Sequence, residues 1–407
     1  MPLASHRTAT QVPRLTNRPL RVAHLGKYYP PSPGGIEEHT RTLARGQAAL
    51  GAEVRVLVVN HADDSGRDAT FERFTRTHDR EECDSPVRVT RVGRLANVAK
   101  LDVAPGLHGA FRRLVRWRPD VWHLHTPNVT MMLGVLACPA VRPLVVTHHS
   151  DIIRQRLLKH LIRPLEEAAY RRAARILPTS PTYAEGSDLL KRFADKVRPL
   201  PLGIDLTPFR DPSPAALAAE QDLKRKYGSP LWLCVGRMIY YKGLRVAVDA
   251  LRSVPGRLLV IGTGPMEGEL RALAAGLGVA DRVAFHGHAT SDQVVGAYRA
   301  ATALWFPSIA RSEGFGLVQV EAMASGCPVI NTAIPGSGVP WVCRHEQEGL
   351  TVPPNDPGAL AAAADRLLRE PGLRGALSLD GRRRAAAEFD HGAMAERSLA
   401  IYGGVRA

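Results

Sequence analysis

Short apolar runs alternate with longer amphipathic stretches along the chain from residue 20 onward. In the first half, largely apolar runs occupy residues 20–25, 53–59, 121–124, 144–147 and 175–179. Runs of this length, separated by helical patterns, predict parallel strands whose sheet is covered by helices on both faces. We therefore expect an α/β, Rossmann-like domain over residues 20–205.

A break in the pattern separates this series from a second one. Residues 206–229 are rich in Pro, Ala, Asp and Lys and predict a linker that leads into a polar helix. The second domain is expected over residues 206–389, because a new series of apolar runs begins there. Its predicted strands are residues 231–235, 258–261, 283–286, 303–307, 328–332 and 350–352. Such sheets bind ligands at the carboxyl ends of their strands, so we expect two doubly wound domains that face each other across a ligand-binding cleft.

Both ends of the chain carry weaker patterns. Residues 1–19 contain arginines and prolines without an apolar run, so they predict a flexible N-terminal extension and no secretory signal. Residues 356–402 are helical by periodicity, and residues 390–407 are expected to form a C-terminal helix or tail that crosses back to the N-terminal domain. The longest apolar stretch, residues 129–146, is interrupted by Pro139, Arg142 and Pro143, so no segment is expected to cross a membrane.

The composition is that of a globular protein, with 45% hydrophobic and 23% charged residues among 407. The formal net charge of +15 points to an anionic partner: nucleic acid, a phosphorylated substrate or an anionic membrane surface. Codon bias toward Arg and Ala explains the charge equally well. Basic amphipathic segments at residues 111–118 and 152–175 suit contact with anionic lipid, although a solvated helix face explains them as well.

The five cysteines are widely spaced and form no C-x-x-C pair, which favours neither a zinc site nor a disulfide framework. A reducing cytosol fits this usage best. The expected location is therefore cytoplasmic, with peripheral contact at the inner face of the plasma membrane as an extension of the lipid hypothesis.

The most informative motif is Ser-Glu-Gly-Phe-Gly-Leu-Val-Gln-Val-Glu-Ala-Met-Ala-Ser-Gly at residues 312–326. Glu313 follows a predicted buried strand, Gly314 and Gly316 allow a tight turn, and Leu317 begins an apolar helix. The free N–H groups and the positive dipole at that helix start suit a diphosphate. Glu321 lies one turn inside the helix among apolar neighbours, so its carboxylate needs hydrogen-bond donors, which ribose hydroxyls would supply. The alternatives are a buried ion pair for Glu321 and a surface charge for Glu313.

A second motif, Val-Gly-Arg-Met-Ile-Tyr-Tyr-Lys-Gly, occupies residues 235–243 at the end of the first strand of the second domain. Arg237 and Lys242 flank one short loop. Lys242 also precedes a predicted helix, where a cation opposes the dipole unless an anion lies between them. A pair of phosphates would resolve that conflict, whereas two solvated loop charges are the simpler interpretation.

Together with Gly34-Gly35 after the first strand and Pro-Leu-Gly-Ile-Asp at residues 201–205, these motifs resemble the retaining family-four glycosyltransferases of GT-B fold. The resemblance covers nearly the whole chain from residue 20. It implies that Glu313 contacts the transferred sugar and that Glu321 holds the nucleotide ribose. It also implies that Arg237 and Lys242 bind the diphosphate and stabilise the leaving group. The remaining donor-binding positions implied are Gly314, Phe315, Gly316 and Leu317.

In the first domain, the loop Tyr-Pro-Pro-Ser-Pro-Gly-Gly at residues 29–35 would bring bare backbone against a phosphate or sugar, although a Gly-Gly turn is often only a turn. Two histidine pairs follow later strands. His123 and His125 share a strand face, whereas His148 and His149 diverge, so no metal site is expected. The resemblance places His125 close to the donor sugar and His149 on the acceptor side.

The Gly262-Thr263-Gly264-Pro265 turn begins like a dinucleotide fingerprint, but Gly268 comes one residue too late and no acidic ribose partner follows. An NAD-dependent enzyme is therefore a poor fit. We expect this turn and His286-Gly287-His288 to line the nucleotide pocket.

The resemblance implies a retaining hexosyltransferase. We expect this enzyme to need no metal or other cofactor, because Arg237, Lys242 and the helix start replace a divalent cation. The leaving phosphate would accept the acceptor's proton on the same face of the sugar. Residues 335–342, with His345 and residues 349–352, are similar to bacterial mannosyl- and rhamnosyl-type transferases of polysaccharide assembly. GDP-mannose is therefore the expected donor, and a glycan or lipid-linked hydroxyl is the expected acceptor.

Three alternatives stay open at this stage. A UDP-hexose could replace GDP-mannose, because no residue reads the base in a way that the sequence reveals. A hydrolysing nucleotide-sugar epimerase shares the fold. An inactive nucleotide-sugar-binding subunit is disfavoured, because a scaffold needs no groups that stabilise a leaving group. Nucleic acid is not an expected partner, and the sequence does not fix the oligomeric state.

Overall fold

The computed structural model describes residues 18–32, 34–63, 66–69, 72–98, 101–151 and 156–406. These residues fall into two compact units. The first unit comprises the described residues up to Thr147, residues Ile162–Ile176 and those from Met394 onward. The second comprises the described part of His148–Leu161 and all of Leu177–Ala393. Most of the predicted N-terminal extension, residues 1–19, lies outside the described residues.

The first sheet has seven strands in the order β3-β4-β2-β1-β7-β8-β9. Its central pairs β4–β2, β2–β1 and β1–β7 are parallel, as the alternating pattern predicts, whereas β3 pairs antiparallel with β4 at the edge. The strands are β1 (Arg21–Leu25), β2 (Glu53–Val59), β3 (Arg80–Asp84), β4 (Val87–Val92), β7 (Val121–Thr126), β8 (Leu144–His148) and β9 (Arg175–Pro178). The sequence analysis missed β3 and β4, as well as the hairpin formed by β5 (Ala96–Val98) and β6 (Leu101–Val103).

Helices pack on this sheet through the apolar sides that their sequences predict. Helix α1 (Gly35–Ala49) buries Leu43 and Ala44, and α2 (Leu107–Trp117) buries Phe111 and Leu114. Helix α3 (Val129–Ala137) begins at Asn128, whose side chain accepts a hydrogen bond from the Met131 N–H and so caps the helix. The other helices associated with this unit are α4 (Arg156–Arg172) and α16 (His391–Arg406).

The second sheet is parallel throughout and has six strands in the order β12-β11-β10-β13-β14-β15. Its strands are β10 (Leu231–Val235), β11 (Arg257–Ile261), β12 (Val283–Gly287), β13 (Ala303–Phe306), β14 (Val329–Thr332) and β15 (Gly349–Val352). The order changes direction at β10 and β13, whose carboxyl ends carry the two motifs. A ligand site at such a switch point is typical of doubly wound sheets.

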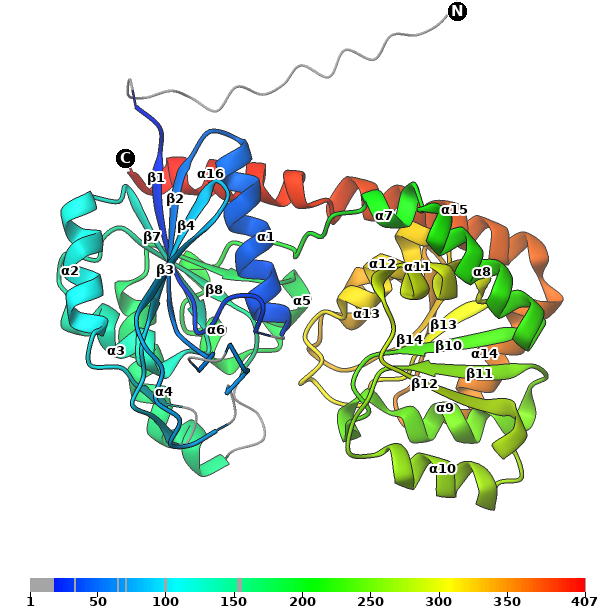
Figure 1. The fold of residues 1–407 in the computed structure, drawn as a ribbon. Coiled ribbons are helices and arrows are strands. Elements are labelled where there is room, and N and C mark those ends of the chain that lie inside the picture. Colours follow the sequence, from blue (N-terminus) through cyan, green and yellow to red (C-terminus); the bar gives the residue numbers. More distant parts are fainter. Residues whose placement is uncertain are drawn as a thin grey trace, which may run out of the picture. The chain divides into compact units, whose positions relative to one another are not determined.

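Alternate side chains of β10 enter two separate cores, one on each face of this sheet. Trp232 and Cys234 pack on the side of α9 (Leu244–Ala250), α10 (Glu267–Gly276) and α14 (Pro357–Arg369). Leu231 and Leu233 pack on the side of α8 (Pro214–Tyr227), α11 (Ser291–Ala300) and α12 (Leu317–Ser325). Figure 1 shows these two helix layers on opposite faces of the sheet. The remaining helices are α5 (Pro181–Glu185), α6 (Asp188–Lys191), α7 (Thr207–Arg210), α13 (Val339–Val342) and α15 (Pro371–Glu388), with short 3-10 turns η1 (Ala194–Lys196), η2 (Tyr240–Lys242), η3 (Leu251–Ser253) and η4 (Ala280–Arg282).

The division into units differs from the predicted boundary at residue 205. Described residues of 148–161, together with residues 177–205, pack with the second unit. Asp151 and Tyr183 explain part of this, because both bind Arg311 of the second unit. The C-terminal part of α16, from Met394 onward, belongs to the first unit, where Ser398 and Tyr402 are buried.

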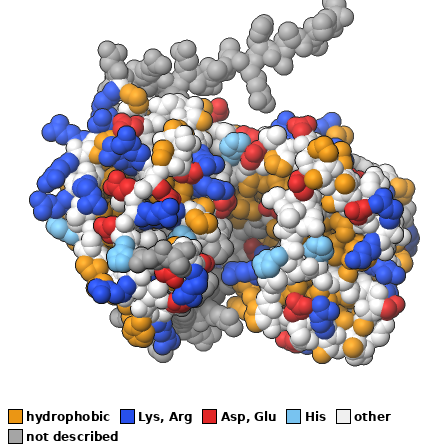
Figure 2. Space-filling model, in the orientation of Figure 1, with side chains coloured by type: hydrophobic (Ala, Val, Ile, Leu, Met, Phe, Trp, Pro, Cys, Tyr) orange, Lys and Arg blue, Asp and Glu red, His pale blue; other side chains and the backbone are white. Residues whose placement is uncertain are grey.

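The two basic segments of the sequence correspond largely to helices α2 and α4. Helix α2 exposes Arg112, Arg113 and Arg116, and Arg118 follows it on the surface. Residues 152–155 of the second basic segment lie outside the described residues, and the rest forms α4 and the start of β9. In Figure 2, Lys and Arg side chains are spread over the visible face of the first unit. Within the described ranges, every helix is too short or too polar to span a bilayer.

Candidate active site

The motif at residues 312–326 forms the predicted turn and helix. Gly316 has a φ of 79° and is the residue that precedes the first turn of α12, which has no side-chain cap. A Cβ atom at Gly316 would lie 2.6 Å from the Phe306 ring, so both the left-handed backbone and the packing require glycine. Gly326, with a φ of 76°, ends the helix. The start of α12 therefore presents backbone N–H groups that no side chain caps.

Lys242 and Glu313 form an ion pair beside this turn. Lys242 Nζ lies 2.6 Å from Glu313 Oε2, and the side chains are only 16% and 11% exposed. The Ser308 hydroxyl also donates to Glu313 Oε2, at 3.4 Å. The ammonium group lies 5.2 Å from the centre of the Phe306 ring, which adds a cation–π contact. The two motifs found in the sequence thus meet through opposite charges.

Glu321 points from α12 to Tyr298 of α11. The Tyr298 hydroxyl donates to Glu321 Oε2 at 2.7 Å. Burial raises the pKa of Glu321 above its usual range, and the tyrosine hydrogen bond and the Lys242 charge oppose that shift. The buried carboxylate of Glu321 therefore has a hydrogen-bond donor within the protein, the Tyr298 hydroxyl. Sequence reasoning missed Tyr298, which lies 23 residues away along the chain.

Arg237 lies exposed in the loop after β10, and in the described ranges its guanidinium makes no hydrogen bond or ion pair. Its loop rests on the Gly-Thr-Gly turn: the Met238 N–H donates to the Thr263 carbonyl at 2.9 Å. A Cβ atom at Gly264 would come within 2.5 Å of the Met238 backbone, so the two turns can approach this closely only through glycine. The Gly262 N–H in turn donates to the Gly287 carbonyl at 2.8 Å. The structure thus brings the Arg237 loop next to the two turns that the sequence predicts as the lining of the nucleotide pocket.

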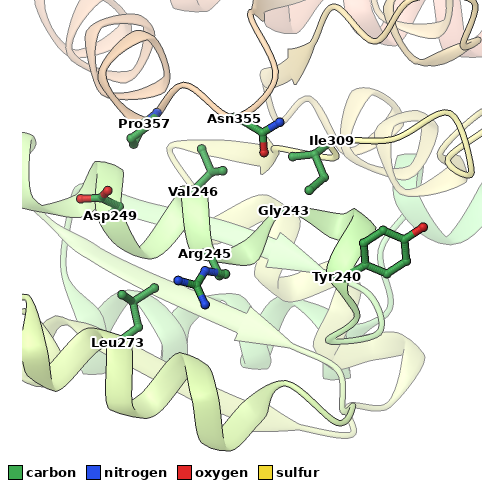
Figure 3. A pocket seen from close by; sticks show the side chains of 9 residues that line it. All are labelled: Tyr240, Gly243, Arg245, Val246, Asp249, Leu273, Ile309, Asn355 and Pro357. Atoms are coloured by element: carbon green, nitrogen blue, oxygen red, sulfur yellow. The ribbon is translucent and has the colours of Figure 1, made fainter.

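A shallow cavity of about 230 Å³ lies beside the same loop. Figure 3 shows its lining side chains, which come from the loop after β10 and from α9, α10 and the segments after β13 and β15. Tyr240 and Gly243, the neighbours of Lys242 in this loop, are among them. The cavity is too small to hold a whole nucleotide sugar, because ligand pockets measure about 300–1,000 Å³.

Arg311 holds the loop that carries Glu313, a role that the sequence did not reveal. Its guanidinium pairs with Asp151 at 2.6 Å and donates to the carbonyls of Gly336 at 2.7 Å and Tyr183 at 3.0 Å. Burial alone would raise the pKa of Asp151, but contacts with His148 and the Arg311 charge hold it well below its usual range. This clamp fixes the backbone two residues before Glu313.

Two further contacts support the Glu-Gly-Phe-Gly turn from the other side. The Ser337 hydroxyl donates to the Glu313 carbonyl at 2.5 Å, and the Gly338 N–H donates to the Gly314 carbonyl at 3.0 Å. A Cβ atom at Gly314 would lie 3.3 Å from the His149 carbonyl, so His149, the predicted acceptor-side residue, borders this turn. Phe315 is buried against Phe389, so only its backbone could meet a ligand.

The predicted residues of the first unit occupy two places. Gly34 precedes α1 with an extended backbone and no side-chain cap, and Gly35 is the first residue of the helix. Pro33 of the same loop lies outside the described residues. His125 is buried at the end of β7, where its ring stacks on that of His123 at 4.5 Å, as the strand alternation predicts.

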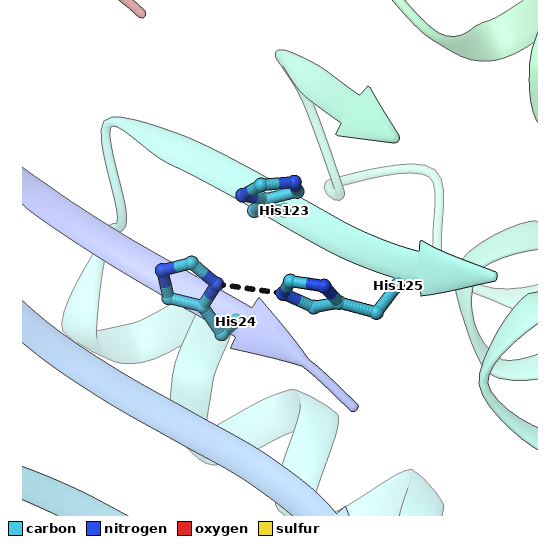
Figure 4. Close-up of side chains that lie close together, drawn as sticks. All are labelled: His24, His123 and His125. Atoms are coloured by element: carbon cyan, nitrogen blue, oxygen red, sulfur yellow. Dashed lines mark hydrogen bonds between the residues drawn. The ribbon is translucent and has the colours of Figure 1, made fainter. Parts of the chain in front are cut away.

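His24 completes a histidine cluster with these two residues. Figure 4 shows His24 and His125 joined by a hydrogen bond, with His123 beside them. One ring nitrogen of each lies within 4.8 Å of the others, a spacing that a transition metal could use. Hydrogen bonds, however, already engage both ring nitrogens of His24, both of His123 and Nε2 of His125.

Comparison with known proteins identifies the family of this chain. The model described as "Glycosyl transferase 4-like domain" matches residues 34–203, and the model described as "Glycosyl transferases group 1" matches residues 229–370. The D-rhamnosyltransferase WbpZ of Pseudomonas aeruginosa is 33% identical over 360 residues, which cover 86% of this chain and 87% of that protein. The chain belongs to the family-four glycosyltransferases.

Other relatives of this glycosyltransferase agree with that assignment. The O-antigen chain mannosyltransferase C of Escherichia coli is 28% identical over 387 residues, 94% of this chain and 98% of that protein. Among solved structures, sucrose-phosphate synthase of Thermosynechococcus elongatus has a TM-score of 0.74 at 25% identity and covers 95% of this chain and 98% of its own. The GT-B fold expected from the sequence is thereby confirmed.

The two matched regions divide the predicted site residues of the glycosyltransferase between them. The region at 229–370 contains Arg237, Lys242, the Glu313–Leu317 turn and Glu321. The region at 34–203 contains Gly34, Gly35, His125 and His149. Every predicted site residue therefore lies in a part of the chain that resembles the family.

Proposed function

We propose that this glycosyltransferase is a retaining, metal-independent hexosyltransferase that moves mannose from GDP-mannose to a hydroxyl of a glycan or lipid-linked acceptor. The observation that supports it most is the Lys242–Glu313 ion pair next to the uncapped start of α12. A cation, a carboxylate and free N–H groups beside one turn are the parts needed to hold a sugar diphosphate without a metal ion.

Lys242 changes partners in this proposal. Without donor, Glu313 neutralises it. A bound diphosphate offers the ammonium group a stronger anion, and Arg237, exposed in the same loop, binds the other phosphate. The N–H groups at Gly316 and Leu317 stabilise the charge that grows on the leaving phosphate. Glu313 is then released to contact the transferred sugar.

The remaining contacts follow from the same arrangement. Glu321, held by Tyr298, accepts hydrogen bonds from the ribose hydroxyls. The backbone at Gly34 and Gly35 contacts the donor, His125 contacts the donor sugar, and His149 serves the acceptor side. The leaving phosphate accepts the proton of the attacking hydroxyl on the same face of the sugar, so the anomeric configuration is retained.

Mannose is proposed from the names of two relatives, and GDP from the resemblance of residues 335–342, His345 and residues 349–352 to mannosyl-type transferases, rather than from a base-reading residue. One relative is named as an O-antigen chain mannosyltransferase and another as a D-rhamnosyltransferase. The segment at 335–342, which suggested this donor, supports the site directly through Ser337 and Gly338. A UDP-hexose remains the alternative donor, and a hydrolysing epimerase remains the alternative enzyme.

We place the enzyme at the cytoplasmic side of polysaccharide assembly, in peripheral contact with anionic lipid. Arg112, Arg113 and Arg116 are exposed on α2, and exposed apolar side chains lie at Leu95, Val98 and Val103 around the β5–β6 hairpin. Basic helices of this kind bind anionic bilayers more strongly than neutral ones. Sedimentation with phosphatidylglycerol vesicles should therefore exceed that with phosphatidylcholine vesicles, and equal sedimentation would remove the lipid from the proposal.

The transferase proposal is tested by incubating the enzyme in EDTA with GDP-mannose and an alkyl-linked mannobiose acceptor. We expect an acceptor-dependent product with an α linkage, the configuration of the donor. Glu313→Gln should abolish it, whereas Glu346→Gln, which changes an exposed glutamate of the same unit, should not. A β-linked product, an absolute need for magnesium, or release of nucleotide without acceptor would each contradict the proposal.

A further inference from the structure

The interior of the first unit contains a continuous chain of polar side chains. Gln47 of α1 donates through Nε2 to the Ser398 hydroxyl at 2.8 Å and to the Tyr402 hydroxyl at 3.0 Å, both on α16. On its other side, Gln47 Oε1 lies 2.8 Å from His24 Nε2. His24 Nδ1 lies 3.0 Å from Nε2 of His125. All five side chains are buried, so water does not compete for these bonds.

The direction of each hydrogen bond follows from Ser398, which lies at one end of this series of side chains. The Ser398 hydroxyl donates to the Ala395 carbonyl of its own helix at 2.7 Å, so it can only accept from Gln47. This turns the amide nitrogen of Gln47 toward α16 and its oxygen toward His24. Gln47 Oε1 therefore accepts from a protonated Nε2 of His24.

The protonation of the two ring nitrogens of His24 then determines the tautomer of His125. Burial lowers the pKa of His24 to about 4, so its ring is neutral at physiological pH. A neutral ring that is protonated at Nε2 keeps a lone pair at Nδ1. His24 Nδ1 must therefore accept its hydrogen bond from Nε2–H of His125.

A branch through Tyr402 obeys the same rule. Because the Tyr402 hydroxyl accepts from Gln47, its own proton is directed to Nδ1 of His123 at 2.5 Å. His123 consequently carries its proton at Nε2 and donates to the Thr147 hydroxyl at 2.6 Å. Each bond of the network is thus satisfied by one donor and one acceptor.

We infer that Gln47, oriented by Ser398 and Tyr402 of the C-terminal helix, is a positioning residue that holds His125 as its Nε2–H tautomer through His24. The inference rests on the proposed function only in assigning His125 to the donor sugar. In this tautomer Nδ1 is the nitrogen of His125 that keeps its lone pair. The last helix of the chain therefore sets the proton position on a ring that belongs to the proposed site.

The network also predicts which changes release His125. With either Ser398 or Tyr402 still present, the Gln47 amide keeps one acceptor on α16 and retains its orientation. Without both hydroxyls the amide can rotate and donate to His24 Nε2. His24 would then carry its proton at Nδ1 and donate to His125 Nε2, so the tautomer of His125 would reverse.

The test is long-range ¹H–¹⁵N NMR of histidine-labelled full-length protein, with the His125 signals assigned by their loss in His125→Asn. We expect a protonated Nε2 for His125 in the wild type and in the single variants Ser398→Ala and Tyr402→Phe. The double variant should shift His125 toward a protonated Nδ1. Gln47→Leu removes the amide that fixes the protonation of His24, so it should also release the His125 tautomer. Tyr28→Phe, which removes another buried hydroxyl of this unit, one that binds Asp102, should leave the signals unchanged.

Kinetics supply a readout of the tautomer that a purely structural role would not move. The double variant should lower kcat about fivefold, equivalent to about 1 kcal/mol, with the KM for GDP-mannose unchanged. An Nδ1-protonated His125 in the wild type, a metal-type shift of its ring nitrogens, or an unchanged tautomer in the double variant would overturn the inference. The NMR measurement needs no substrate, so an inactive wild type would refute the proposed function and leave this result intact.

Discussion

The Lys242–Glu313 ion pair should contribute to both the stability and the activity of the enzyme. At 2.6 Å and an effective dielectric constant of about 20, the attraction between the two charges is about 6 kcal/mol. Most of it is offset, because removing each ion from water costs several kcal/mol. We expect a net coupling of about 0.5–3 kcal/mol, the range found for residues in direct contact.

A double-mutant cycle with Lys242→Met and Glu313→Gln measures this coupling. Each single variant leaves a largely buried polar or charged partner unsatisfied and should lower the free energy of unfolding by about 1–3 kcal/mol. The double variant should lose less than the sum of the singles. Urea unfolding followed by tryptophan fluorescence gives the values, since Trp232 and Trp305 lie stacked in the core of the same unit.

The matched control is the pair Arg366 and Glu346 on the surface of the same unit, whose side chains are 39% and 50% exposed. Its cycle should show no measurable coupling, because water screens exposed charges. The kinetic counterpart is a kcat for Lys242→Met that is about 100- to 1,000-fold lower, as for the loss of one group that stabilises a developing anion. A coupling no larger than that of the surface pair, with near-normal kcat, would refute this reasoning.

Three further predictions follow from the same geometry. Tyr298→Phe removes the hydroxyl that donates a hydrogen bond to the partly buried Glu321. GDP binding, measured by calorimetry, should weaken by about 1–3 kcal/mol, and an unchanged affinity would contradict the proposed contact of Glu321 with the ribose. Arg311→Met breaks the clamp on the Glu313 loop and should lower both Tm and kcat, while an unchanged kcat would show that the clamp serves stability alone. Burial lowers the pKa of His24 to about 4, so the unfolded chain binds a proton at this ring at a higher pH than the folded protein does, and His24 should lower stability by about 2 kcal/mol near pH 5. Burial lowers the pKa of His39 to about 3, which adds to this fall; His24→Asn should therefore make the pH dependence of urea unfolding shallower, and an equal slope would contradict the reasoning.

The parallel strands were the most predictable part of this fold. Residues 53–59 and 231–235 were predicted with the bounds that the structure has, because strands buried on both faces appear as continuous apolar runs. The edge strand Arg80–Asp84 was missed, since its sequence Arg-Glu-Glu-Cys-Asp is polar and largely exposed. The inner strand Val87–Val92 was missed as well, because its sequence Val-Arg-Val-Thr-Arg-Val alternates apolar and polar residues. Pattern reasoning therefore detects strands that are apolar throughout and misses those that carry several charged residues.

The candidate site was predicted where chemistry is concentrated in short motifs. Glu313 and Lys242 were chosen from loops with glycine-rich turns, and the structure brings them into contact. Arg311 and Asp151 were not found, because they lie 160 positions apart and meet only through tertiary packing. The same holds for Gln47 and Tyr402, which are 355 positions apart. Residues that support a site from distant segments leave no local signal.

The central claim is that two cations and a helix start hold the diphosphate without a metal ion. Calorimetric titration of GDP into the enzyme in EDTA tests it most directly, with Arg237→Ala and Lys242→Met as variants. The account predicts binding that magnesium does not strengthen and that each variant weakens about tenfold or more, because each removes a charge-assisted contact. Binding that appears only with magnesium, or that both variants leave unchanged, would contradict it.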